Sequence, residues 1–412
     1  MDAPPTVEED RRLPSSATPP PRPALSWSRR SLGEIAVAAL LGLAACAPQA
    51  SVPVAVPAAP PIGGAAVTAQ ATARAALLLP LTGPQAPLGQ ALLQAGTMAL
   101  FDETTSGVEF LPRDTGGTPS GAAAAARAAL AEGARALVGP LTSGETAAVA
   151  PVARAAGVPL LAFTNDSQRA GEGVWVLGMT PEQQVRRVAS AAAREGAQRF
   201  VLAAPANEFG RALAAALQGA MRDLRLPPPA IALHPANVDL AMAASAARMA
   251  APQADALLLG ETGERARRFV AAYVAEASAA QPGGQAPRLL GTALWLNNPA
   301  LAGEPALGGA WFPGPDASYR TRFEERYRAA FGETPPRIAA SAYDAAALAA
   351  RALRSTSPVA TVTAQQSFPG ADGPVRLLSD GQTLRGLAIY ALSPEGEAVL
   401  VEPAPEPAGA GF

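Results

Sequence analysis

ALVGPLTSGETAAVAPVARAAGVPLLAF, residues 136–163, holds two strand patterns separated by one helix pattern. Residues 136–139 and 158–163 are apolar runs, and the segment between them is rich in alanine. A short apolar run followed by a helix is typical of a buried parallel strand with a right-handed crossover. Thr142 or Ser143 can cap this helix, because a side-chain oxygen there accepts a hydrogen bond from the first N–H groups. The stretch therefore predicts one β–α–β unit.

The same alternation continues on both sides of this unit. The apolar runs that we interpret as strands are residues 75–80, 108–111, 136–139, 158–163, 174–177, 200–204, 231–234, 256–260 and 289–292. The helices expected between them are residues 89–101, 121–132, 146–156, 183–195, 210–224, 240–249 and 263–276. The sequence therefore predicts a doubly wound α/β fold. So many strands favour two lobes, each with a parallel sheet, over one large sheet.

The composition excludes several classes of function. The chain has 412 residues and a formal net charge of −2, so no global positive field attracts nucleic acid. It contains no lysine, which removes Schiff-base chemistry and phosphate loops. It has one histidine and one cysteine, too few for a His₂ or Cys₄ metal site. We therefore expect no enzymatic activity, no cofactor, no metal and no nucleic-acid partner.

The amino-terminal part has the pattern of an export signal. Arg29 and Arg30 precede the apolar run 35–45, which ends at Cys46. The residues before Cys46 resemble the lipobox of bacterial lipoproteins, in which the cysteine is lipidated and becomes the first residue of the mature chain. The alternative is a short membrane anchor with an incidental cysteine. We expect a leader and signal peptide over 1–46 and a Pro/Ala-rich tether over 47–74.

Three stretches carry a family resemblance: ALLLPLTGP (76–84), residues 136–165, and residues 323–348 with FEERY and AYDA. In this order they resemble type I periplasmic binding proteins of the leucine-binding class. Within that class they are most similar to the ligand-binding-fold domain of penicillin-binding protein activators. The resemblance implies two Rossmann-like lobes joined by three crossovers, with a ligand cleft between them. It places lobe one at 75–179 and 313–386, lobe two at 180–312 and 387–400, and a disordered tail at 401–412.

The resemblance also implies which residues line the cleft in lobe one. It places Ser143 at the ligand carboxylate, together with the loop Thr164, Asn165 and Asp166, and it places Thr142 beside them. The alternative from the residues alone is that Thr142 or Ser143 is only a helix cap and that Asn165 and Asp166 only form a turn.

In lobe two the resemblance points to Asn207, Phe209, Glu261 and Trp295. Relatives have a tyrosine at the position of Phe209, and an acid for the ligand ammonium where this chain has Thr292–Trp295. Without that acid, an amino-acid ammonium is buried unpaired, which is costly. Glu261 is the candidate substitute.

Two functions follow from the resemblance. The first is a periplasmic lipoprotein, with the outer membrane favoured because Ala47 is not aspartate, that binds and stimulates a bifunctional penicillin-binding protein, a peptidoglycan synthase. The alternative is the substrate-binding subunit of an ABC importer for branched-chain or related amino acids. The missing acid near Thr292 and the short connection 102–108 argue against the importer. A small ligand in the cleft is compatible with both functions.

Overall fold

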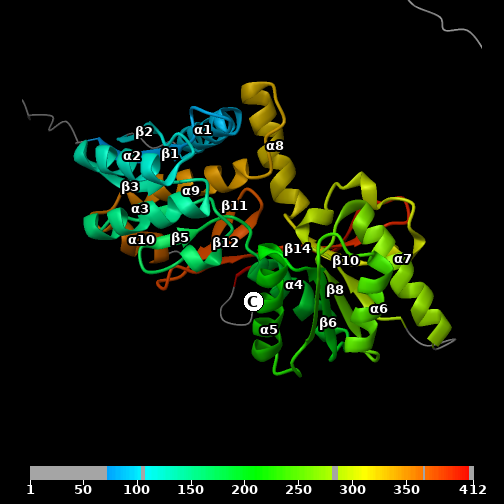
Figure 1. The fold of residues 1–412 in the computed structure, drawn as a ribbon. Helices are drawn as coiled ribbons and strands as arrows, with labels where there is room; N and C mark the ends of the chain where they lie inside the picture. The colour runs from blue at the N-terminus through cyan, green and yellow to red at the C-terminus, as the bar shows by residue number, and fades with distance from the viewer. Residues whose placement is uncertain (1–71, 104–106, 281–285, 365–366, 408–412) are drawn as a thin grey trace, which may run out of the picture. The chain divides into compact units, whose positions relative to one another are not determined.

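The computed structural model describes residues 72–103, 107–280, 286–364 and 367–407. Two large β-sheets organise this part of the chain (Figure 1). Sheet A has the strand order β2-β1-β3-β4-β5, and its neighbouring strands are all parallel. Its strands are β1 (Ala73–Leu79), β2 (Val108–Asp114), β3 (Ala134–Val138), β4 (Leu160–Ala162) and β5 (Val174–Val176).

Helices cover both faces of sheet A. Successive side chains of a strand point to opposite faces, so apolar neighbours in one strand pack against different helices. In β1, Leu77 and Leu79 pack in one hydrophobic cluster with α1 (Ala86–Asp102), α8 (Ala317–Phe331) and α9 (Ala339–Ala352). Leu78 packs in another cluster with α2 (Pro119–Ala131) and α3 (Ser143–Ala156). The continuous apolar run at 75–80 therefore marks a strand buried on both sides.

Sheet B has the strand order β15-β14-β10-β9-β8-β6-β7. Its strands are β6 (Phe200–Pro205), β7 (Ala230–His234), β8 (Ala256–Leu259), β9 (Arg288–Leu290), β10 (Trp311–Gly314), β14 (Ala388–Leu392) and β15 (Ala398–Glu402). The five strands β10, β9, β8, β6 and β7 are parallel to one another, whereas β14 is antiparallel to β10 and β15 is antiparallel to β14. The expected parallel arrangement is thus present in the main part of sheet B, and β14 and β15 add an antiparallel edge to it. A short turn joins β14 to β15, and only an antiparallel pair can be joined so tightly.

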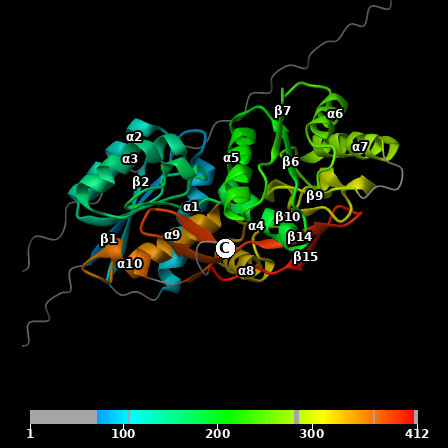
Figure 2. The same cartoon turned by 90° about the horizontal axis from the view of Figure 1, so that it is seen from below.

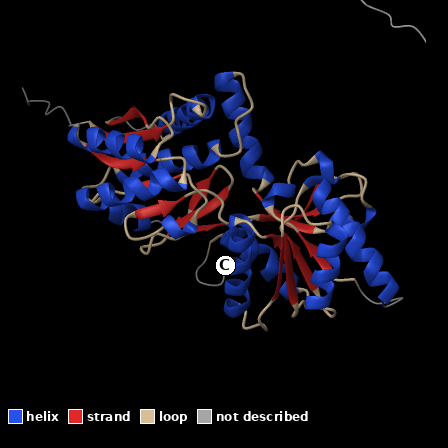
Figure 3. Ribbon diagram, viewed as in Figure 1, coloured by secondary structure: helices blue, strands red, loops and turns tan. Residues whose placement is uncertain are grey.

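Sheet B is also covered on both faces (Figure 3). Val201 and Ala203 pack with α6 (Leu240–Ala250) and α7 (Gly263–Ala280). Leu202 and Ala204 pack with α4 (Pro181–Arg194) and α5 (Glu208–Asp223) on the other face. Figure 2 shows α6 and α7 side by side, as α2 and α3 are on sheet A. The predicted α/β alternation is thus confirmed in every strand and helix expected between residues 75 and 292.

The chain passes three times between the part built on sheet A and the part built on sheet B: from β5 to α4, from β10 to α8, and from residue 385 to β14. We call sheet A with α1–α3, α8 and α9 the first lobe, and sheet B with α4–α7 the second lobe. The first lobe also includes α10 (Pro358–Ala364) and the small antiparallel sheet C, whose Phe368 and Val375 join the cluster of α9. Sheet C consists of β11 (Phe368–Gly370), β12 (Gly373–Leu377) and β13 (Thr383–Arg385).

The chain is structured beyond residue 400. Strand β15 extends to Glu402, whose carboxylate accepts hydrogen bonds from Arg187 and Arg194 at 2.9 Å each. The backbone N–H of Ala404 donates to Asp316 at 2.8 Å. Residues 401–407 therefore belong to the fold, contrary to the expected disordered tail from 401. Within the described ranges, no helix is both long enough and apolar enough to cross a membrane.

Candidate functional site

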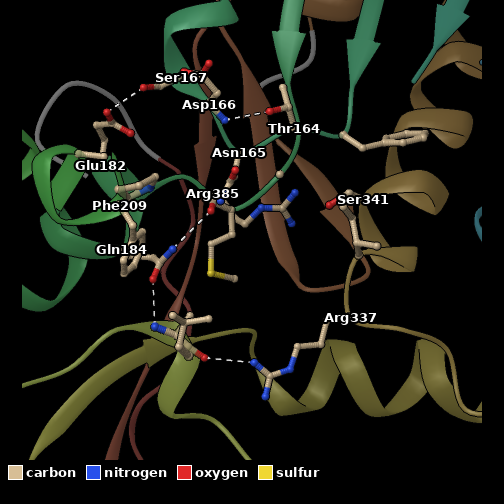
Figure 4. A pocket seen from close by; sticks show the side chains of 18 of the residues that line it. Thr164, Asn165, Asp166, Ser167, Glu182, Gln184, Phe209, Arg337, Ser341 and Arg385 are labelled. Carbon is tan, nitrogen blue, oxygen red and sulfur yellow. Dashed lines mark hydrogen bonds between the residues drawn. The ribbon is translucent and has the colours of Figure 1, made fainter. Parts of the chain in front are cut away.

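A cavity of about 1060 Å³ lies at the carboxyl ends of strands from both sheets (Figure 4). The loops after β3, β4, β6 and β9 form most of its wall, together with the starts of α4 and α5 and the segment before α9. Ligands of open α/β sheets bind at the carboxyl ends of strands. A volume of roughly 300–1,000 Å³ is usual for a small-molecule pocket. This cavity, which we call the cleft, is therefore the candidate ligand-binding site.

Seven of the cleft residues expected from the sequence line it: Thr142, Ser143, Thr164, Asn165, Asp166, Asn207 and Phe209. Glu261 and Trp295 do not line it. The candidate lipidation site, Cys46, lies outside the described residues. Contact of any of these side chains with a ligand stays a prediction.

Thr142 is the N-cap of α3. Its hydroxyl oxygen accepts a hydrogen bond from the N–H of Glu145 at 3.3 Å. In return, the Glu145 carboxylate accepts from the N–H and the hydroxyl of Thr142, at 3.0 and 2.8 Å. This reciprocal arrangement is a capping box, and it satisfies N–H groups that have no partner in the helix. The cap fixes the direction in which α3 begins and so holds Ser143 at the cleft.

Ser143, Asp166 and Arg169 form a network at the start of α3. The Ser143 hydroxyl donates to Asp166 Oδ2 at 2.5 Å. Arg169 Nε donates to the same carboxylate oxygen at 2.9 Å and to Ser143 Oγ at 3.0 Å. The other carboxylate oxygen, Asp166 Oδ1, accepts from the N–H of Gln168 at 3.0 Å. We call this the Ser143–Asp166–Arg169 network.

Asp166 is negatively charged in this network. Burial alone raises the pKa of its carboxyl. The hydrogen bonds from Ser143, Arg169 and the N–H of Gln168, together with the positive charge of Arg169, outweigh burial, and the pKa is lowered. The side chain of Asp166 is 22% exposed and lines the cleft. The hydroxyl and the cation next to α3 are therefore already engaged with a carboxylate of the chain itself.

The remaining polar side chains of this loop are neutral. The Thr164 hydroxyl oxygen accepts from the N–H of Asp166 at 3.1 Å, which leaves its own O–H free to donate. Asn165 and Gln168 are exposed in the cleft, and their side chains have no hydrogen-bond partner among the described residues. Carboxamides offer both donors and acceptors. This wall can therefore form hydrogen bonds with a ligand in both directions.

The second lobe presents the start of α5. Asn207 is the N-cap, and its side-chain oxygen accepts from the N–H of Gly210 at 2.9 Å. Phe209 is half-buried and gives the cleft an aromatic surface. Ala212 and Ala215, one turn or more further along α5, also line the cleft and leave space for a ligand.

Arg337 and Gln184 connect the walls of the cleft (Figure 4). Arg337, which precedes α9 in the first lobe, donates to the carbonyl oxygen of Ala293 at 3.4 Å and also to that of Leu296. Both carbonyls belong to the loop after β9 in the second lobe. Gln184 in α4 accepts from the N–H of Ala293 at 2.9 Å. Two side chains thus hold the loop after β9 against the cleft.

A buried ion pair lies beneath the first-lobe side of the cleft. Arg385 donates to the carbonyl of Leu177 at 2.9 Å and lies 3.4 Å from the carboxylate of Asp344. Ser341 donates to the same carbonyl at 3.1 Å. Burial raises the pKa of Asp344 to about 6, although Arg385 and the N–H of Ala371 oppose the shift. Leu177 and Arg385 both stand at crossovers between the lobes, so this cluster holds the connection between them.

Glu261 and Trp295 have structural partners elsewhere. The Glu261 carboxylate is paired with Arg265 at 2.8 Å and lies 3.5 Å from His234 Nε2. Trp295 is fully buried, and its indole N–H donates to the carbonyl oxygen of Glu261 at 2.9 Å. The Trp295 ring packs so closely on Gly291 that a Cβ at Gly291 would lie 2.3 Å from it. The core of the second lobe therefore takes up both side chains.

Sequence reasoning missed the arginines of this site. Arg169 follows Asp166 by three residues, a spacing that could have indicated an ion pair. Arg337 and Arg385 carried no local signal, because their partners lie 41 and 208 residues away. Within the described part of the chain, no group of three or more His, Cys, Asp or Glu is arranged to hold a metal ion.

Comparisons with known proteins show which family and which solved structures share this architecture. Residues 72–397 match the family model described as periplasmic binding protein. A search of curated proteins found no match. Three similar solved structures, each 16–20% identical in sequence, cover 80–82% of this chain and 94–100% of their own.

The three structures share the fold of this chain. A candidate branched-chain amino acid ABC transporter protein from Rhodospirillum rubrum has a TM-score of 0.69. An ABC transporter substrate-binding protein from Sphaerobacter thermophilus has a TM-score of 0.63. A binding protein for leucine, isoleucine, valine, threonine and alanine from Brucella ovis, in its closed conformation, has a TM-score of 0.59. At these identities the likeness establishes the two-lobed binding-protein fold and not the ligand.

Proposed function

Because the chain belongs to the periplasmic binding protein family, we propose that it captures a small solute in its cleft and delivers it to an ABC importer. The family indicates the periplasm as its compartment, and its members bind solutes rather than catalyse reactions. The observation that carries the proposal is the cleft of about 1060 Å³, with walls from both lobes at strand carboxyl ends. The similar structures are mostly transporter substrate-binding proteins, which supports the importer over the other function expected from the sequence.

A cleft-filling variant tests the proposal. Ala215 lines the cleft on α5 and is exposed, so Ala215→Trp should fill the cavity without disturbing the core. Ala246→Trp, on the exposed side of α6 and outside the cleft, is the matched control. A calorimetric screen of amino acids, amides, aromatic acids and sugars should find a saturable ligand for the unmodified chain. We expect its affinity to fall at least tenfold in Ala215→Trp and to stay within twofold in Ala246→Trp. Equal weakening in both variants, or no ligand in the screen, would count against solute capture.

A second candidate function is stimulation of a bifunctional penicillin-binding protein. It rests on the resemblance of the chain to penicillin-binding protein activators, and the mutual hydrogen bond of Ser143 and Asp166 is compatible with it, because this part of the cleft needs no ligand. A synthase assay with purified components separates the two functions. Stimulation that survives Ala215→Trp supports the activator, because that role does not use the cleft, and absence of stimulation removes it.

The attachment of the chain to a membrane is a separate proposal. We infer from the lipobox-like residues before Cys46 that the mature chain begins at a lipidated cysteine. Cys46→Ser should release the protein from the membrane fraction and block processing of the precursor. Unchanged fractionation together with unchanged processing would refute lipidation at Cys46.

A further inference from the structure

The start of α3 offers donors that suit a ligand carboxylate, and a carboxylate of the chain already occupies them. A hydroxyl from Ser143 and a guanidinium from Arg169 converge at the start of α3, where backbone N–H groups also favour negative charge. Both groups are bound to Asp166 Oδ2, at 2.5 and 2.9 Å. The carboxylate that these donors stabilise therefore comes from the protein.

A second carboxylate at this position would meet the first. The hydrogen bonds from Ser143 and Arg169 lower the pKa of Asp166 against the opposing effect of burial, so its charge persists at neutral pH. Arg169 is the ion-pair partner of Asp166 and balances one negative charge, not two. Like charges at contact distance repel strongly where water is partly excluded. An acidic ligand group is thus disfavoured here.

The same arrangement favours ligand groups that donate hydrogen bonds. Asp166 Oδ1 accepts one bond, from the N–H of Gln168, and retains acceptor capacity toward the cleft. The carboxamides of Asn165 and Gln168, unpartnered within the described chain, lie on either side of Asp166 in sequence and can accept or donate. Amide N–H and alcohol O–H groups match this surface, whereas a carboxylate has nothing to donate.

We propose that Asp166 is a specificity-determining residue that excludes a ligand carboxylate from the start of α3 and selects ligands that present an uncharged amide or alcohol group there. This inference rests on the proposed solute-binding function and names its substrate class. It also assigns Asp166 a role opposite to the one expected from the sequence, where the Thr164–Asp166 loop was placed at a ligand carboxylate.

The test replaces the charge and keeps the shape. In Asp166→Asn the side-chain oxygen can still accept from the N–H of Gln168. Arg169, which does not itself line the cleft, loses its carboxylate partner, so its positive charge beside Ser143 is no longer balanced. The probes are two matched pairs: leucine with leucinamide, and 4-hydroxybenzoate with 4-hydroxybenzamide. Calorimetry on the full chain should show at least a tenfold gain in affinity for the carboxylate member of a pair in Asp166→Asn. The amide members should gain less than threefold.

Two further variants sharpen the result. Asp166→Asn combined with Arg169→Met should abolish the gain, because Arg169 then no longer supplies the positive charge. Glu264→Gln changes the net charge by the same amount at an exposed ion pair outside the cleft, and it should show no gain. If Asp166→Asn does not melt cooperatively, Asp166→Ser replaces it in the same comparison.

Every outcome decides the inference. A carboxylate gain in Asp166→Asn that depends on Arg169 supports it. The absence of a gain in carboxylate affinity overturns it, whether the unmodified chain and Asp166→Asn both bind the carboxylates or neither does. Low-micromolar binding of leucine or 4-hydroxybenzoate by the unmodified chain also overturns it, yet that result would uphold solute binding. Failure of the proposed function is recognised separately, by the absence of any ligand in the screen that uses Ala215→Trp.

Discussion

Asp344 shows how burial changes the chemistry of a single residue. It is fully buried in α9, where its carboxylate accepts from the N–H of Ala371 at 2.7 Å and faces Arg385. Gly370 lies so close that a Cβ there would be 2.7 Å from the Asp344 carboxylate. Water therefore has no room to solvate this charge, and the fold raises the pKa of the carboxyl to about 6.

This shift predicts the pH dependence of stability. A pKa above the ordinary 3.8 means that the folded chain binds this proton more tightly than the unfolded chain does. The resulting stabilisation is complete below about pH 3.8 and is lost as the pH rises through about 6. We therefore expect the unfolding free energy of the unmodified chain to fall, relative to that of Asp344→Asn, between pH 4 and pH 7. Urea denaturation of both proteins measures the difference, and a difference that is independent of pH refutes the assignment.

At the scale of elements, capping residues set where the cleft helices begin. α3 and α4 both start with a capping box, formed by Thr142 with Glu145 and by Thr180 with Gln183. The two boxes differ in charge, because Glu145 is a buried acid. Its carboxylate also accepts a hydrogen bond from the Thr142 hydroxyl at 2.8 Å. Gln183 is neutral, and its side-chain amide also donates to the carbonyl of Thr383 at 2.7 Å.

The matched pair Thr142→Ala and Thr180→Ala tests the caps. Each should lower the unfolding free energy by about 1 kcal/mol, the usual cost of losing a helix cap. Thr142→Ala should cost more, up to about 2 kcal/mol, because a buried carboxylate loses a donor. Only Thr142 lines the cleft, so ligand affinity should respond to the first substitution and not to the second. Chemical denaturation with parallel calorimetry makes the comparison, and equal effects on binding would contradict it.

At the scale of the whole molecule, Arg337 joins the lobes across the cleft. Its guanidinium lies in the first lobe and donates to the carbonyl oxygens of Ala293 and Leu296 in the second. Opening of the cleft must break these bonds, so Arg337 stabilises the arrangement in which the loop after β9 contacts the segment before α9. Arg211 is the matched contrast, since it also lines the cleft but donates to Ala206 within its own lobe, at 3.2 Å.

We expect Arg337→Ala to loosen the loop after β9. A hydrogen bond from a charged donor contributes about 1.5–3 kcal/mol, so amide exchange in residues 292–297 should accelerate about tenfold or more. Arg211→Ala should leave exchange in that loop unchanged. Hydrogen–deuterium exchange read by mass spectrometry measures both variants. Identical exchange in the unmodified chain and Arg337→Ala would show that the contact does not hold the lobes.

The sequence alone determined the succession of strands and helices and the places where helices begin. The apolar run at 75–80 and the threonine at 142 act on residues within a few positions, so their effects are visible in local periodicity and capping patterns. The number of strands also indicated two lobes, and the family resemblance of three stretches implied a cleft between them, at strand carboxyl ends.

Only the tertiary structure decided which side chains meet. Asp166 is bound by Ser143, 23 residues away, and Arg385 reaches Leu177 across 208 residues. Trp295 fills the core next to Gly291 instead of facing the cleft, and β14 enters sheet B antiparallel. These outcomes depend on how whole elements pack and on the register of distant strands, which no local pattern encodes. The cleft could therefore be located from the sequence, whereas its charge arrangement, on which the proposed class of ligand rests, could not.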